Sequence, residues 1–206
     1  MSDEAAAGQG ERALREMQQR VRAMGGVIRC VARRTVETSR SLEDFQERFD
    51  GRLGALVRAH AAMSRNVAGE ASLDEIVRDT LQEQAPAASN WSVDGPEVRL
   101  PVVLTDPLAL LLHELAVEAV AGGALGDASG RLIVDWTVDG DAAGARRLLL
   151  GWRETGLKER RPPTNFDFAR VLLDYMASRG AAPEADETAS DGLRLCLRLP
   201  LSAAGT

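Results

Sequence analysis

Apolar residues recur every three or four positions through the first third of the chain, which is the spacing of a helical packing seam. A first run holds Leu14, Met17, Val21, Met24, Ile28 and Val31, and a second holds Phe45, Phe49, Leu53, Leu56, His60 and Met63. Between them, Ser41 and Asp44 have the Ser-x-x-acid spacing of a helix start. The pattern predicts an antiparallel helical hairpin. Because its apolar faces are too wide for one hairpin to cover, two copies are expected to pair as a four-helix bundle.

From residue 71 the pattern changes to shorter helices and period-two strands. Helices are predicted after a capping box at Ser72 and Glu75, from Asp106-Pro107 to about residue 120, and over residues 166–179. Strands are predicted as a pair around an Asp94-Gly95 turn in residues 91–101, as a hairpin of residues 131–138 and 147–152, and over residues 193–199. The acidic residues 183–191 are predicted to form a mobile loop.

These elements place the chain in the α+β class, with a helical hairpin before a two-layer α/β sandwich that has a mixed sheet. The predicted divisions are residues 1–10 disordered, 11–70 hairpin, 71–201 sandwich and 202–206 a loose tail.

Composition narrows the function classes. The net charge of -6 argues against a broad basic surface for nucleic acid. Cys30 and Cys196 make no disulfide framework, and no metal-ligand spacing of Cys and His occurs. No apolar run is long enough to span a bilayer, and the first ten residues lack the pattern of a secretory signal. A cytoplasmic location without a membrane is the expectation.

Three short motifs carry the candidate chemistry. Residues 16–21 open the first helix, His113-Glu114-Leu115-Ala116 lies on an apolar helix, and Trp152-Arg153-Glu154-Thr155-Gly156 follows an apolar strand. In this order and spacing they resemble the catalytic core of the HWE class of bacterial sensor histidine kinases. The resemblance covers residues 11–200. It implies a dimerisation and phosphotransfer hairpin followed by a sandwich of the histidine-kinase ATPase type.

The resemblance assigns a role to each motif and also shows where this chain departs from the family. The family's phosphoryl-accepting histidine stands where this chain has Gln19, whose amide has no basic lone pair to attack a γ-phosphate. His113, Glu114 and Glu118 correspond to the motif that helps to bind Mg²⁺, with Glu118 in place of an asparagine. Trp152, Glu154 and Gly156 correspond to the motif whose acid binds adenine.

The phosphate-binding loop departs most from the family. The family has Gly-Phe-Gly-Ser, and this chain has Asn165-Phe166-Asp167-Phe168. Both glycines that would let backbone N–H groups approach phosphate are replaced, and Asp167 would repel it. The sequence therefore predicts a degenerate nucleotide pocket with no dedicated metal site. ATP and Mg²⁺ are the cofactors only if that pocket still works.

The first helix also offers a candidate partner surface, formed by Arg15, Gln19, Arg20 and Arg22. Arginine binds carboxylates through two parallel hydrogen bonds, which suits an acidic receiver domain of a response regulator. The alternative reading of these arginines is an ordinary solvated helix face.

The sequence thus predicts a homodimeric, degenerate histidine-kinase-like protein of two-component signalling that binds a response regulator or a partner kinase. One alternative is an active kinase or phosphotransferase in which His60 replaces the missing acceptor, although a buried structural histidine is the simpler reading of His60. Another is a regulator that resembles anti-sigma factors, which use the same sandwich to hold a sigma factor.

Overall fold

A computed structural model describes residues 2–65, 70–140, 145–157, 166–186 and 192–201. The chain forms two compact units, Met1–Leu53 and Gly54–Thr206, and each is considered by itself. The division falls inside the second helix, whereas the sequence placed it at residue 70. Among the described residues, no helix is both long enough and apolar enough to cross a bilayer.

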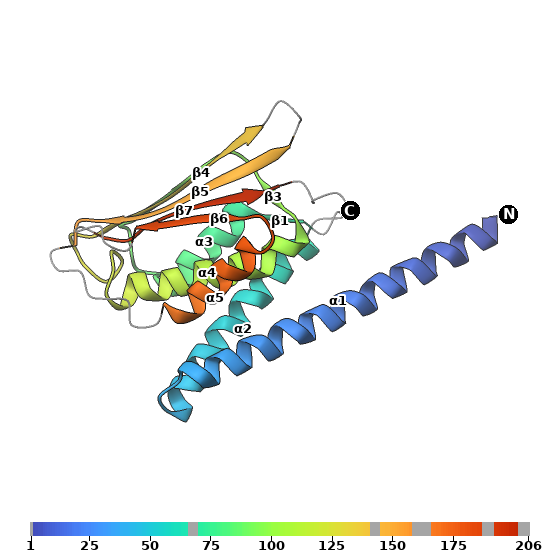
Figure 1. Cartoon of the computed structure of the whole chain (residues 1–206), viewed down its shortest axis with the longest axis horizontal. Coiled ribbons are helices and arrows are strands. Elements are labelled where there is room, and N and C mark those ends of the chain that lie inside the picture. The colour runs from blue at the N-terminus through green and yellow to red at the C-terminus, as the bar shows by residue number, and fades with distance from the viewer. Residues whose placement is uncertain (1, 66–69, 141–144, 158–165, 187–191, 202–206) are drawn as a thin grey trace. The chain divides into compact units, whose positions relative to one another are not determined.

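The first unit is built from helix α1 (Ser2–Thr38) and the first half of helix α2 (Leu42–Ser64), labelled in Figure 1. Helix α1 includes residues 2–10, which the sequence predicted to be disordered. Near the turn, Val31 and Thr35 are buried, and Nη1 of the buried Arg52 donates a hydrogen bond to Thr35 Oγ1 at 2.8 Å. This polar contact joins the two helices beside their connecting turn.

Ser41 caps α2 as the sequence predicted, but Asp44 accepts from the backbone of Arg40 and not from that of Ser41. The Asp44 N–H donates to Ser41 Oγ at 3.2 Å, and the Arg40 N–H donates to Asp44 Oδ2 at 2.8 Å. The bond from the Arg40 backbone, followed by the Arg48 side chain, lowers the pKa of Asp44 below its ordinary value. Asp44 therefore caps the helix in its charged form.

The second unit is a two-layer sandwich. Its main sheet has the order β2-β4-β5-β7-β6, with β2 parallel to β4 and the other neighbours antiparallel; β1 and β3 form a separate small sheet. The strands are β1 (Ala71–Ser72), β2 (Trp91–Asp94), β3 (Arg99–Leu100), β4 (Arg131–Gly140), β5 (Arg146–Thr155), β6 (Ala182–Asp186) and β7 (Arg194–Pro200). The helices are α3 (Leu73–Gln84), α4 (Val102–Ala121) and α5 (Asp167–Ala177).

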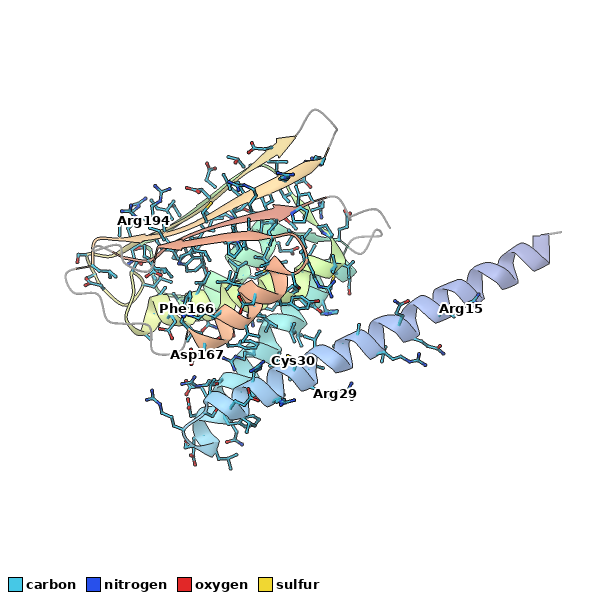
Figure 2. All side chains as sticks on the ribbon, in the orientation of Figure 1. Arg15, Arg29, Cys30, Phe166, Asp167 and Arg194 are labelled. Atoms are coloured by element: carbon cyan, nitrogen blue, oxygen red, sulfur yellow. The ribbon has the colours of Figure 1, made fainter. Side chains whose placement is uncertain are left out.

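Helices α3, α4 and α5 cover one face of the main sheet (Figure 1). Alternate residues of the central strands are buried on that face, as expected for a half-covered sheet. On β5 these are Leu148, Leu150, Trp152 and Glu154. The opposite face carries polar residues, including Arg194 (Figure 2). This confirms the predicted α+β class.

The predicted strand pair around Asp94-Gly95 is wrong. Strand β2 runs parallel to β4, with Trp91 opposite Leu132, and β3 pairs with β1 instead. Gly95 serves a different purpose, because a Cβ there would lie 2.4 Å from the ring of Trp136. The indole Nε1–H of Trp136 donates to the Pro96 carbonyl at 2.7 Å. Gly95 thus leaves room for the ring of Trp136 and does not form a hairpin turn.

Three other element boundaries differ from the prediction. Helix α4 begins at Val102, so Pro107 lies inside it and not at its first position. Ser72 precedes α3 but makes no side-chain cap bond, because it belongs to β1 and Glu75 pairs with Arg65. Residues 182–186 form strand β6, although 183–191 were predicted to be a loop; residues 187–191 lie outside the described part.

Candidate functional site

The predicted magnesium motif lies on α4, and the apolar composition of residues 102–121 buries most of this helix. His113 and Glu114 are buried, with 4% and 7% of their surface exposed, and Glu118 is half-buried. The two glutamates are four residues apart and therefore share a helix face. Among the residues that the structure describes, no three His, Cys, Asp or Glu side chains are placed to hold a metal ion.

Glu154 is the most constrained residue of the motif on β5, and only 3% of its surface is exposed. Its Oε1 accepts a hydrogen bond from Trp152 Nε1–H at 3.1 Å. Its Oε2 accepts one from the Ala124 N–H at 2.8 Å. Both carboxylate oxygens are thus engaged by protein donors. Glu154 fastens the loop after α4 to the end of β5.

The glycines around Glu154 allow this close packing. A Cβ at Gly123 would lie 2.2 Å from Glu154 Oε2. Gly156 has a φ of +80°, and a Cβ there would lie 2.4 Å from the Ser129 carbonyl oxygen. The Ser129 hydroxyl donates to the Gly156 carbonyl at 3.1 Å. Gly156, which the resemblance placed in the adenine motif, therefore holds the same loop at a second point.

Asn90 is a site residue that the sequence reasoning missed. Its Nδ2 amide donates to the carbonyls of Ala124, Asp127 and Gly130, at 2.7, 3.3 and 3.0 Å. The loop of residues 122–130 is consequently bonded to Asn90, to Glu154 and, through its own Ser129, to Gly156. No motif marks Asn90, and only the glycines at 122, 123, 126 and 130 signal a tightly packed loop.

The stretch that the resemblance aligns with the phosphate-binding loop lies at the start of α5 (Figure 2). Phe166 and Phe168 are buried, with 6% and 2% of their surface exposed, while Asp167 is exposed in the first turn. A carboxylate in a first helical turn occupies the end that the helix dipole makes attractive to anions. Asn165 lies outside the described residues. Apolar side chains and an acid thus stand where phosphate would need backbone donors.

The predicted partner surface on α1 is only partly described. Gln19 and Arg22 are exposed, as is Arg15, which Figure 2 labels. Residues 15, 19 and 22 are spaced by four and three, so they share one helix face. Arg29, seven residues after Arg22, is also exposed. The side chain of Arg20 lies outside the described part of the chain.

His60 belongs to the second unit and has a specific partner there. Its Nε2 lies 3.0 Å from Oδ1 of Asp106 on α4, and a third of the His60 side chain is exposed. The side chain is thus partly exposed, whereas the structural reading expected a buried histidine.

Comparison with known proteins agrees with this architecture. A family model described as HWE histidine kinase matches residues 16–97. The blue-light-activated histidine kinase of Rhizobium johnstonii is 32% identical over 151 residues, which is 72% of this chain and 42% of that protein. Its counterpart in Brucella anthropi is 28% identical over 194 residues, which is 92% of this chain and 39% of that protein. The chain thus spans about two fifths of the length of these relatives.

The solved structure of the Erythrobacter litoralis EL346 blue-light activated histidine kinase has the same fold, with a TM-score of 0.61 at 16% identity. The match covers 90% of this chain and 60% of that one. The histidine kinase domain of the same protein matches with a TM-score of 0.51 at 17% identity. This chain therefore carries the core of an HWE-class histidine kinase, a class of two-component signalling.

Proposed function

We propose that this chain is a degenerate histidine-kinase core which acts by binding a response regulator or a partner kinase, not by transferring phosphate. The observation that carries the proposal is the exposed position of Gln19 on α1, within the segment that matches the family model. A phosphoryl acceptor must be exposed in this way, but an amide supplies no nucleophilic nitrogen.

The pocket remnant supports the same proposal. The acid that the resemblance assigns to adenine, Glu154, is 3% exposed, and its two oxygens accept bonds from Trp152 and Ala124. The phosphate-binding end carries Phe166, Asp167 and Phe168 in place of glycines. In this proposal, phosphoryl transfer lacks its acceptor at Gln19 and its phosphate-binding loop at residues 166–168.

The partner surface in this proposal is the exposed face of α1 that contains Arg15, Gln19 and Arg22, with Arg20 beside it. Arg22 makes no ion pair within the described residues, so binding an acidic partner would not first require it to leave a carboxylate. The apolar seam of the same helix supports a homodimer, because Val21 is 61% exposed in a single copy.

Incubation of the purified chain with labelled ATP and Mg²⁺ tests the loss of catalysis. We expect no acid-labile phosphohistidine, while an intact histidine kinase assayed in parallel becomes labelled. The variant Gln19→His should also stay unlabelled, because it restores the acceptor without restoring the phosphate loop. Labelling of the native chain that disappears in His60→Ala would instead establish His60 as a substitute acceptor.

Calorimetric titration against purified receiver domains tests the binding role. We expect one receiver to bind, and Arg22→Glu to weaken that binding by about tenfold or more, since it reverses a charge in the interface. The matched control is Arg131→Glu, which reverses an exposed arginine of β4 that likewise makes no ion pair within the described residues.

Two results would count against the binding role. Equal losses of receiver binding in Arg22→Glu and Arg131→Glu would remove α1 as the binding surface, and capture of a sigma factor alone would favour the anti-sigma alternative. Light scattering on the same samples is expected to give twice the chain mass of 22.1 kDa. A monomer mass at all concentrations would contradict the homodimer.

A further inference from the structure

Helix α1 contains two adjacent glycines, Gly25 and Gly26, inside its 37 residues. Neither has a positive φ, so both continue the helix. A Cβ on either glycine would come within 4 Å of no atom of the described chain other than its sequence neighbours and the backbone of α1 itself. Crowding within this chain therefore does not require glycine at these two positions.

The glycine pair separates two parts of α1 that are packed differently, both within the unit Met1–Leu53. After the pair, Val31 and Thr35 are buried, with 2% and 0% of their surface exposed, and Thr35 accepts a hydrogen bond from Arg52 of α2. Before the pair, every side chain that the structure describes in residues 15–23 is exposed. Packing therefore fixes α1 on only one side of the two glycines.

Glycine weakens a helix at such a boundary more than any other residue except proline. One glycine in a helix interior makes the helical state about fivefold less favourable than alanine does, so two in succession have an effect of roughly tenfold or more. Sharp bends of helices occur mostly where glycine, proline or an inserted group interrupts the hydrogen-bond ladder. Because the described side chains before the pair are exposed, tertiary packing does not compensate for this local weakness.

We propose that Gly25 and Gly26 form a hinge in α1. Residues 15–24, called the α1 arm below, change direction at this hinge, while residues 27–38 stay packed beside the start of α2. The arm carries Arg15, Gln19 and Arg22, so the hinge sets the direction in which this face is presented to a partner. That consequence rests on the proposed binding role, whereas the bending itself does not.

Pulsed electron paramagnetic resonance on the full chain tests the hinge without any partner. Nitroxide labels on Gln18→Cys and Arg33→Cys occupy exposed positions on either side of the glycine pair, and both native cysteines are changed to serine. Dilution with unlabelled chain leaves only distances within one molecule. A straight helix puts the two positions about 22 Å apart. We expect a broad distribution that extends below this distance, and one about half as wide in Gly25→Ala with Gly26→Ala.

Two further variants identify the cause of the narrowing. The matched control Gly54→Ala removes a glycine from α2, where the new Cβ would lie 3.2 Å from the flexible end of Arg58, and should leave the distribution as broad as in the native chain. Ala23→Gly, added to the double alanine variant at an exposed position just before the pair, should restore most of the lost breadth. A hinge requires local flexibility and no particular side-chain contact.

Three results would overturn the proposal. Equally narrow distributions in the native chain and in the double alanine variant would show that α1 does not bend. Equally broad distributions in both would place the bending away from the glycine pair. Narrowing in Gly54→Ala as large as in the double alanine variant would indicate a general stabilisation of the hairpin. Receiver binding is measured separately by titration, so the hinge and the binding role can fail independently.

Discussion

Phe168→Ser is expected to lower the free energy of unfolding of the sandwich by about 3–5 kcal/mol, the cost of removing a buried phenylalanine from a core. Only 2% of the Phe168 surface is exposed, and it stands at the second position of α5, the helix that packs against α4. The new hydroxyl adds a polar group to an apolar site, which increases the loss. Denaturant unfolding of the full chain, followed by circular dichroism, measures the change.

The neighbouring residue supplies the matched control. Asp167 is exposed one position earlier in the same turn, so Asp167→Asn removes only a charge that favours the helix start, at a cost of about 0.3–1 kcal/mol. A Phe168→Ser variant as stable as Asp167→Asn would show that Phe168 is not part of the core.

This difference bears on the role of the side chain at position 168. In the motif of the resembled family a serine stands at position 168 and a glycine at position 167. Restoring the serine alone is expected to remove a large fraction of the 5–15 kcal/mol by which a domain of this kind is usually stable. A phenylalanine that completes the core cannot be exchanged for a serine without compensating changes. The substitution therefore has a structural consequence as well as a chemical one.

The parts of the fold that the sequence predicted correctly are those whose signals are local. The alternation of apolar and polar residues predicted the hairpin of β4 and β5, in which Val134 is opposite Trp152 and Trp136 is opposite Leu150. Ser41 and Asp44 gave the start of α2, because a capping pair acts within one helical turn. The helix predicted over residues 166–179 is α5, which ends at Ala177, and Gly180 follows it with a φ of +90°.

The errors have non-local causes. Trp91 and Leu132 are partners in a parallel ladder although 41 positions separate them, so nothing near Asp94-Gly95 indicates that β2 belongs beside β4. The Asp-Gly pair normally signals a hairpin, but here the glycine makes room for Trp136. Pro107 was assigned to the first position of α4 by a general preference that the preceding residues override.

The site residues also divide into those that local sequence signals identify and those that depend on distant parts of the chain. Sequence reasoning selected Trp152 and Glu154, which the structure brings into direct contact. The resemblance assigned Glu154 to adenine, and the sequence gives no sign of its second partner, the backbone N–H of Ala124, thirty residues earlier in the chain. Backbone donors leave no mark in a sequence. Only Gly123, where a Cβ would meet the carboxylate, is a residue type that hints at the approach.

The internal role of Glu154 leads to the second large effect. Glu154→Gln is expected to lower the free energy of unfolding by about 1–3 kcal/mol, because it leaves a buried donor without an acceptor. The carboxylate accepts from both Trp152 Nε1–H and the Ala124 N–H, whereas an amide has one oxygen and an NH₂ group. One of the two donors must then face another donor. Hydrogen exchange should also show faster opening of residues 122–130, together with the lower midpoint in denaturant.

Asp135→Asn separates this effect from the mere loss of a charge. Asp135 pairs with Arg153 at 2.8 Å on the open face of the sheet, and nearly half of each side chain is exposed. An ion pair of that kind contributes at most about 1 kcal/mol, so the control should be close to native. If the two carboxylate-to-amide changes have equal effects, the buried bonds of Glu154 are not what holds the loop after α4. If Glu154→Gln alone is destabilising, the carboxylate is a structural anchor for the loop after α4.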